Sequence, residues 1–301
     1  MPLVPMTDLL RGAMDGGYGV GYFEAWDLPS LEVVLDAAEA EQAPVVLGFG
    51  GMMVDGGWLE QRGIAMLGAA GRALAERSGV PVSLIFNEAQ TLHQAFAALD
   101  AGFNAVLLST EGLEPRAALA ATRQLVERAH VAGAAVEAEV GSLPDAAAPD
   151  HPGELTDPEA ARAFVEQTGI DCLAVSIGNV HVKTDGWAAI DAARLEAIHR
   201  AVPLPLAIHG GTSFPPHAVP HAIHHGVAKF NVGTVLKTTF CDALVASAAA
   251  LPESADVHSL MGSHKASDLL VPACQALRER VRLLIRLYGG SGRAPIPEHA
   301  R

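Results

Sequence analysis

Short hydrophobic runs rich in β-branched residues recur along the whole chain. Most are continuous rather than alternating, which is typical of parallel strands that are buried on both faces. They predict eight strands, at Tyr18–Phe23, Pro44–Phe49, Val80–Phe86, Ala105–Leu108, Ala134–Val140, Cys172–Ile177, Pro205–Ile208 and Ala228–Val232.

Stretches rich in Ala, Leu, Glu and Arg lie between and after these runs and predict amphipathic helices. The helices are expected at Leu31–Glu41, Leu59–Ser78, Thr91–Ala101, Glu114–Ala132, Asp157–Thr168, Ala192–Val202, Pro216–Gly226 and Val235–Ala250. Eight βα units in a chain of 301 residues predict a (β/α)8 TIM barrel. A doubly wound open sheet is the alternative, but no glycine-rich dinucleotide motif follows the first strand.

The chain is expected to form a single barrel domain, residues 1–301, with a helical extension at about 257–290. This extension is expected because Val257–Tyr288 carries Leu and Val at helical spacing beyond the eighth strand. An arm of this kind often packs on a neighbouring subunit, so we expect a homo-oligomer, either a dimer or a tetramer.

Composition and charge exclude several classes of protein. Hydrophobic residues make up 50% of the chain and charged residues 18%, which argues against intrinsic disorder. A net charge of -14 makes nucleic acid or an anionic membrane surface a poor partner. No apolar run reaches the ~18–20 residues that span a bilayer. The three cysteines are far apart, which excludes a disulfide framework and predicts reduced thiols in a cytoplasmic protein.

Polar residues stand at the carboxyl ends of nearly all the predicted strands. A barrel brings these ends to one mouth, where the chemistry of such folds takes place. The residues are Glu24, Gly50, Gly51, Asn87, Glu88, Ser109, Thr110, Glu111, Glu137, Glu139, His181, His209, Gly210, Gly211, Thr212, Ser213, Asn231, Gly233 and Thr234.

Two of these histidines are candidate metal ligands. Either His181 or His209 alone is better explained as a hydrogen-bonded polar residue in the core. Together at strand ends, with Glu88 available as a third ligand, they predict an open divalent metal site. A set of two histidines and one glutamate favours Zn²⁺, with Mn²⁺ or Fe²⁺ as alternatives.

A second group of histidines lies on the helix expected after the seventh strand, at positions 217, 221, 224 and 225. His221 and His225 are four residues apart, a spacing that could bind a metal on one helix face. Because this helix should face outward, we expect a solvent-exposed surface instead.

Two turns at adjacent strand ends are candidate phosphate sites. One is His209-Gly210-Gly211-Thr212-Ser213, and the other is Asn231 to Thr234 with Gly233 between them; each precedes a predicted helix. Backbone N–H groups at helix starts bind phosphate, and barrels often place a phosphate site after strands seven and eight. Ordinary tight turns are the alternative. Lys183 is a further candidate for substrate binding.

The segment AIHGGTSFPPHAVPHAIHHGVAKFNVGT resembles the metal- and phosphate-binding segment of the class II (metal-dependent) ketose-bisphosphate aldolases. VEAEVG, LTDPEAARAFVEQTGIDCLAVSIGNVH and GSHKASDLLVPACQALRERVRLLIRLYGG are also similar, in family order, from about Leu10 to Gly290. The resemblance implies a zinc-dependent barrel with His181 and His209 as metal ligands. It implies Glu139 as an acid near the metal that can bind it in an alternative position. Its implied phosphate or substrate contacts are Gly211, Thr212, Asn231 and Thr234.

The sequence departs from that family at the end of the third strand. The family has Asp-His there, the Asp as acid/base and the His as third metal ligand, whereas this chain has Asn87-Glu88. Asparagine cannot carry a proton at neutral pH, and a glutamate ligand adds negative charge. Val182 replaces a family glycine after the first ligand histidine. Glu24 replaces an Asn, and Ser109-Thr110-Glu111 replaces Asp-Gly-Ser.

The scaffold and part of the site therefore match, while the acid/base has changed. We expect metal-dependent aldol cleavage or condensation of a phosphorylated ketose through a metal-stabilised enediolate. Glu24 or Glu111 would take the proton role that Asn87 cannot. The alternatives are a metal-dependent sugar or sugar-acid epimerase on the same scaffold and a catalytically impaired sugar-binding homologue.

Overall fold

The computed structural model describes residues 3–144, 153–182, 186–251 and 256–294. In this part of the chain, eight parallel strands follow one another in chain order and close into a barrel, with β1 paired to both β2 and β8. The strands are β1 (Val20–Ala25), β2 (Val45–Gly50), β3 (Val82–Ala89), β4 (Ala105–Leu108), β5 (Ala135–Val140), β6 (Cys172–Val175), β7 (Leu206–Ile208) and β8 (Val227–Val232). The TIM barrel is confirmed, and the doubly wound sheet is excluded because the strands close.

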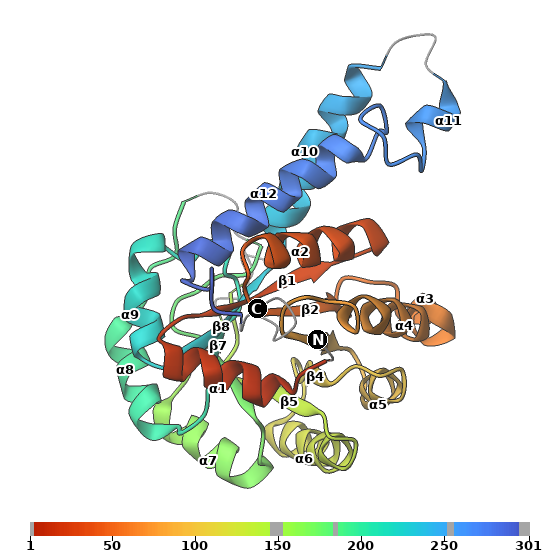
Figure 1. Ribbon diagram of the computed structural model, residues 1–301. Helices are drawn as coiled ribbons and strands as arrows, with labels where there is room; N and C mark the ends of the chain where they lie inside the picture. The colour runs from red at the N-terminus through yellow and green to blue at the C-terminus, as the bar shows by residue number, and fades with distance from the viewer. Residues whose placement is uncertain (1–2, 145–152, 183–185, 252–255, 295–301) are drawn as a thin grey trace.

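Helices form a layer outside the strands (Figure 1). They are α1 (Met6–Gly16), α2 (Leu28–Ala40), α3 (Gly56–Trp58), α4 (Ile64–Ala75), α5 (Leu92–Asp100), α6 (Pro115–Val131), α7 (Pro158–Thr168), α8 (Ala192–Ala201), α9 (Val219–His224), α10 (Thr234–Ala249), α11 (Val257–Leu260) and α12 (Val271–Leu287). The helix expected at Leu59–Ser78 opens with a π-helical turn, Leu59–Gly63, before α4. The helix expected at Pro216–Gly226 opens with a 3-10 turn, Pro216–Ala218.

Helix α1 was not predicted and closes the amino-terminal end of the barrel. Leu3, just before it, forms a bridge with Val82 at the start of β3. The buried side chains of α1, including Met6 and Leu10, pack with small residues inside the barrel, such as Ala105, in one apolar cluster. With this end plugged, the opposite end, where the strands finish, is left as the place for chemistry.

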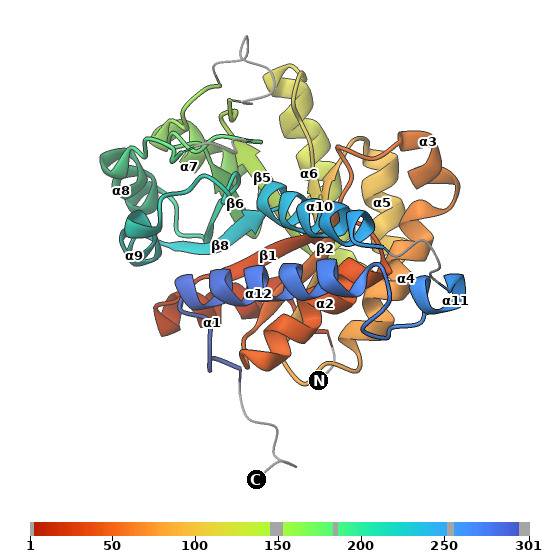
Figure 2. The same cartoon turned by 90° about the horizontal axis from the view of Figure 1, so that it is seen from above.

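Helices α10 and α12 pack on each other, and α12 also packs on α2 (Figures 1 and 2). The far end of this pair, with α11, projects beyond the barrel (Figure 1). The region expected to be mostly helical, Val257–Tyr288, is thus two helices separated by turns. The division of the chain into one barrel domain and an extension stays a prediction. Among the described helices, none has both the length and the apolar character needed to cross a membrane.

Candidate metal centre at the barrel mouth

The end of β3 is irregular where Asn87 and Glu88 stand. The pairing of β3 with β4 shifts register between Phe86 and Ala89, and Glu88 has a left-handed backbone with φ of 56°. Irregularities of this kind re-aim side chains and recur next to active sites. Here the irregularity accompanies a Glu88 side chain that lies beside two imidazoles.

Glu88, His181 and His209 each offer one ligand atom, and these atoms lie within 4.8 Å of one another. The rings of His181 and His209 are stacked, with centroids 6.0 Å apart. The three residues predicted as ligands from separate strand ends are therefore neighbours in the fold. Their role as ligands stays a prediction.

His209 is held from behind by a carboxylate. Its Nε2 lies 2.8 Å from Oε1 of the fully buried Glu137. Its Nδ1 lies 3.0 Å from Glu139 Oε1 and 3.5 Å from Glu88 Oε1, yet this buried nitrogen has no hydrogen-bond partner among the described residues. A carboxylate on one imidazole nitrogen, with the second nitrogen facing other ligand atoms, is the arrangement that protein metal sites use. The donor set thus fits a divalent cation such as Zn²⁺.

The charges around His209 favour a cation. Burial by itself would lower the pKa of His209, but Glu139, Glu137 and Glu88 raise it well above its ordinary value. Burial would raise the pKa of Glu88, yet His209 and His181 lower it overall. The three carboxylates around this imidazole therefore favour positive charge at the site, which a bound metal ion would supply.

Two residues of this network were given no role from the sequence: Glu137 was placed at the barrel mouth without a function, and Lys229 was not among the candidates. Glu137 Oε2 lies 2.8 Å from the Nζ of Lys229, which is also fully buried. The Nζ donates a hydrogen bond to Asn231 Oδ1 over 2.6 Å and lies 4.9 Å from the ring centre of Tyr22. Burial opposes the charge on Glu137, but Lys229 and His209 outweigh it and lower the pKa to about 2. A lysine inside the VAKFNV strand, which is apolar before Asn231 apart from this residue, was the signal that could have found this pair.

The two glycine turns lie side by side at the ends of β7 and β8. Gly211 N donates to the carbonyl of Asn231, and Val235 N, at the start of α10, donates to Thr212 Oγ1 over 3.2 Å. A Cβ at Gly210 would lie 2.4 Å from Val180 O, so a side chain is excluded there. Ser213 donates its hydroxyl to the carbonyls of Val180 and Gly210, so this hydroxyl is turned back into the protein.

Asn231 connects Lys229 of β8 to Asn87 at the end of β3. Its Nδ2 lies 3.5 Å from Oδ1 of the buried Asn87. Just before Thr234 begins α10, Gly233 leaves room for Glu24, since a Cβ at Gly233 would lie 2.1 Å from Glu24 Oε2. Two parts of the predicted site lie outside the described residues. They are Lys183 and residues 145–152 of the loop after β5.

The two proposed proton carriers differ in environment. Glu24 lies 2.6 Å from Lys237 Nζ, and its pKa is raised because burial outweighs the charge of that lysine. Glu111 is exposed in the turn after β4, and among the described residues no hydrogen bond or ion pair joins it to the metal ligands. The surroundings therefore favour Glu24 over Glu111.

Comparison with known proteins identifies the family. Residues 4–293 match the family described as class II fructose-bisphosphate aldolase. The chain belongs to this family. It is 33% identical over 299 residues to a probable fructose-bisphosphate aldolase of Bacillus subtilis, an alignment that covers 98% of this chain and all of that protein. It is 32% identical over 320 residues to the fructose-bisphosphate aldolase of Thermus caldophilus, with 97% and 100% covered.

A solved structure agrees with these relatives. The YdjI aldolase from Escherichia coli K12 matches with a TM-score of 0.80 and 26% identity, over 97% of this chain and all of that one. The protein is thus an aldolase, a carbon–carbon lyase of carbohydrate metabolism, from a family that depends on a divalent metal.

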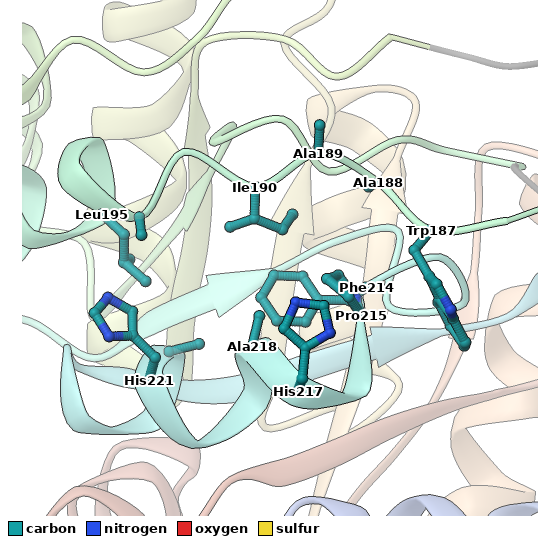
Figure 3. A pocket seen from close by; sticks show the side chains of 12 residues that line it. Trp187, Ala188, Ala189, Ile190, Leu195, Phe214, Pro215, His217, Ala218 and His221 are labelled. Atoms are coloured by element: carbon teal, nitrogen blue, oxygen red, sulfur yellow. The ribbon is translucent and has the colours of Figure 1, made fainter.

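One pocket lies apart from this centre. It has a volume of about 380 Å³ and is lined by the segment before α8, by α8 itself and by the segment from β7 into α9. Figure 3 shows His221 and Leu195 at one end and Trp187 at the other. Its lining contains none of Glu88, His181 or His209, so the cavity is not the metal centre.

Proposed function

We propose that this aldolase cleaves and forms a carbon–carbon bond of a phosphorylated ketose, using a divalent cation, Zn²⁺ foremost, held by Glu88, His181 and His209. The observation that carries the proposal is the buried Nδ1 of His209, which lacks a hydrogen-bond partner among the described residues while Glu137 holds the other ring nitrogen. The Bacillus and Thermus relatives are named fructose-bisphosphate aldolases, which favours a ketose bisphosphate as the substrate class.

A cation in this ligand set would supply Lewis-acid chemistry, withdrawing charge from a substrate carbonyl and stabilising the negative charge that develops on its oxygen. The residues around it have separable tasks. Glu137, fixed by Lys229, orients His209 and keeps its Nδ1 toward the ligands. Glu139, partly exposed beside the same nitrogen, is placed to serve as an alternative ligand.

Proton transfer cannot fall to Asn87, whose amide neither gains nor loses a proton at neutral pH. Glu24 is the better candidate, because its raised pKa brings a carboxyl group closer to the range useful for acid/base work. Lys237, bonded to Glu24, can stabilise the carboxylate after the proton leaves. Asn87 and Asn231 remain as amides that can position substrate oxygens.

Substrate phosphate is proposed to bind at the paired turns. Gly210, Gly211 and Thr212 stand beside Gly233 and Thr234, where α10 begins. A helix start offers N–H groups and a favourable dipole to an anion.

A cytoplasmic location and a homo-oligomeric assembly also stay predictions.

Metal content and product analysis test the proposal. The protein should retain one divalent cation per chain at the barrel mouth, and His209→Ala and His181→Ala should each lose it. Cleavage of a ketose bisphosphate should release a triose phosphate that a coupled triose assay detects. Full retention of this cation in both variants would show that the ligand assignment is wrong.

A further inference from the structure

A second group of metal-binding side chains lies between α8 and α9. Glu196 of α8, together with His221 and His225, offers ligand atoms that all lie within 4.8 Å of one another. His225 stands just after α9 and two residues before β8 begins, so the group lies toward the amino-terminal end of the strands. The metal centre at the mouth is at their opposite end.

The geometry of the two imidazoles suits a shared ion. Their ring centroids are 4.2 Å apart, and His221 Nε2 lies 3.6 Å from Glu196 Oε1. The other carboxylate oxygen of Glu196 lies 3.9 Å from the exposed Arg200. A carboxylate oxygen and two ring nitrogens therefore converge from two helices.

The free nitrogen of His225 can be assigned. Its Nδ1 lies 2.9 Å from the carbonyl oxygen of His221, an acceptor, so Nδ1 carries the hydrogen. In the neutral ring Nε2 then has its lone pair available, and a backbone carbonyl behind a ligand histidine is the usual support in metal sites.

One ring nitrogen of this group, His221 Nε2, is buried without a hydrogen-bond partner among the described residues. His199, outside the group, also has a buried Nδ1 without such a partner, and its ring meets that of His225 edge-on with centroids 6.1 Å apart. Buried polar atoms are almost always bonded, and an exception calls for an explanation such as an ion. The expectation of a wholly exposed face is corrected here: His217 and His224 are exposed, but His221 and His225 are half-buried.

We propose that Glu196, His221 and His225 form a second divalent cation site, taking Zn²⁺ with water completing the shell and tying α8 to α9. Two imidazoles and one carboxylate are a recognised zinc ligand set. The site is separate from the aldolase centre, so it does not depend on the proposed function. His221 also lines the 380 Å³ pocket, which places the ion at one end of that cavity (Figure 3).

Zinc stoichiometry tests the proposal. Metal-free protein is titrated with Zn²⁺ against a chromophoric chelator, with circular dichroism to verify the fold. The full chain should bind two ions, and His221→Ala, His225→Ala and Glu196→Gln should each bind one. Removing a residue that only hydrogen-bonds to a metal ligand lowers metal affinity by ~10–100-fold. Removing a ligand itself should lower the zinc affinity of this site by more than that. His217→Ala, one turn away and outside the group, should still bind two.

A second readout avoids the active site altogether. In a His209→Ala background, Zn²⁺ should raise the melting temperature, because an ion that binds only the folded state stabilises it. Adding His221→Ala or Glu196→Gln should abolish that rise. If zinc binding and the melting temperature are unchanged by these substitutions, the second site is refuted. The second site is also refuted if the full chain binds a single ion that His209→Ala loses, but that result would support the metal site proposed for the aldolase centre.

Discussion

Asn87 is the residue at which this aldolase differs most sharply from its family in chemistry. The resemblance described above implies an acid/base where this chain has an amide, which lies next to Glu88 and 3.5 Å from Asn231 Nδ2. Asn87→Asp should raise the rate of fructose 1,6-bisphosphate cleavage by about 100-fold, the lower range of what general acid–base catalysis contributes. A coupled triose assay measures the change.

The matched control for that substitution is Asn87→Ala, which removes the same amide without adding a proton carrier. It should not raise the rate. An unchanged rate in Asn87→Asp would mean that the substrate has also changed, so that the amide is not the only obstacle to bisphosphate cleavage.

The buried pair of Glu137 and Lys229 is expected to matter for stability as well as for His209. Lys229→Met leaves a carboxylate buried without its partner charge, which should lower the free energy of unfolding by about 3–5 kcal/mol. Denaturant unfolding measures this. The double variant Lys229→Met/Glu137→Gln should recover much of the loss, because no unpaired charge remains. Equal stability of the single and double variants would argue against a coupled pair.

At the residue scale, what could be predicted followed from strand ends. Glu88 and His209 stand at the ends of hydrophobic runs and His181 lies four residues past the end of another, and a barrel brings such ends together. The pairing of Glu137 with Lys229 could not be read this way, because it depends on which residues of β5 and β8 point into the barrel. The conformation of Val182 is also a structural finding: it takes the left-handed backbone, φ 54°, a conformation that favours the glycine which the resemblance implies at this position.

At the scale of elements, Glu41 fastens α2 to α12. It lies just after α2 and accepts hydrogen bonds from Arg282 and Arg286 of α12 and from Ser291. The hydrogen bond from Arg286, helped by Ser291 and Arg282, lowers the pKa of Glu41 to about 2 against the opposing effect of burial. Because this pKa is depressed in the folded state, the stabilisation is complete above the ordinary value near 4.5 and is lost as pH falls toward 2.

Glu41→Gln should therefore lower the free energy of unfolding by about 1–2 kcal/mol at pH 7, a value reduced by solvent screening of the partly exposed arginines. The difference from the unmodified protein should shrink between pH 4.5 and pH 2, as denaturant titrations across this range would record. Glu279→Gln removes a second, exposed partner of Arg282 and should change stability by less than about 0.5 kcal/mol. Equal effects of the two substitutions would contradict the role assigned to Glu41.

The elements themselves were largely predictable, since strands buried on both faces leave continuous apolar runs and helix ends carry local signals. Asp27 and Ser30 form a capping box, and Gly169 ends α7 in a left-handed conformation with φ of 72°. Helix α1 was missed although its buried residues Met6, Leu9, Leu10 and Ala13 have the i, i+3, i+4, i+7 spacing of an amphipathic helix. Only its role in closing the barrel end required the structure. The half-burial of His221 could not be foreseen either, since it depends on how α8 packs beside α9.

At the scale of the whole molecule, the projecting end of the α10–α12 pair is where we expect a second copy to bind. Val245, toward the end of α10, is 68% exposed, and Val257 and Met261 near the tip are 65% and 63% exposed. Large apolar side chains grouped on one arm mark an interaction surface, whereas a single one elsewhere needs no explanation. Val131, 87% exposed at the end of α6, provides that contrast.

A charge placed in an apolar contact between copies must be desolvated or the contact must open. Val245→Asp and Val257→Asp should therefore shift the protein toward monomer, whereas Val131→Asp should not. Light scattering at several concentrations measures the mass. Because the barrel mouth lies on the strands and not on the arm tip, zinc content at the mouth should stay the same in these variants. An oligomer that survives both arm substitutions would have its interface elsewhere. If the unmodified protein is a monomer, the prediction that a second copy binds the arm is wrong.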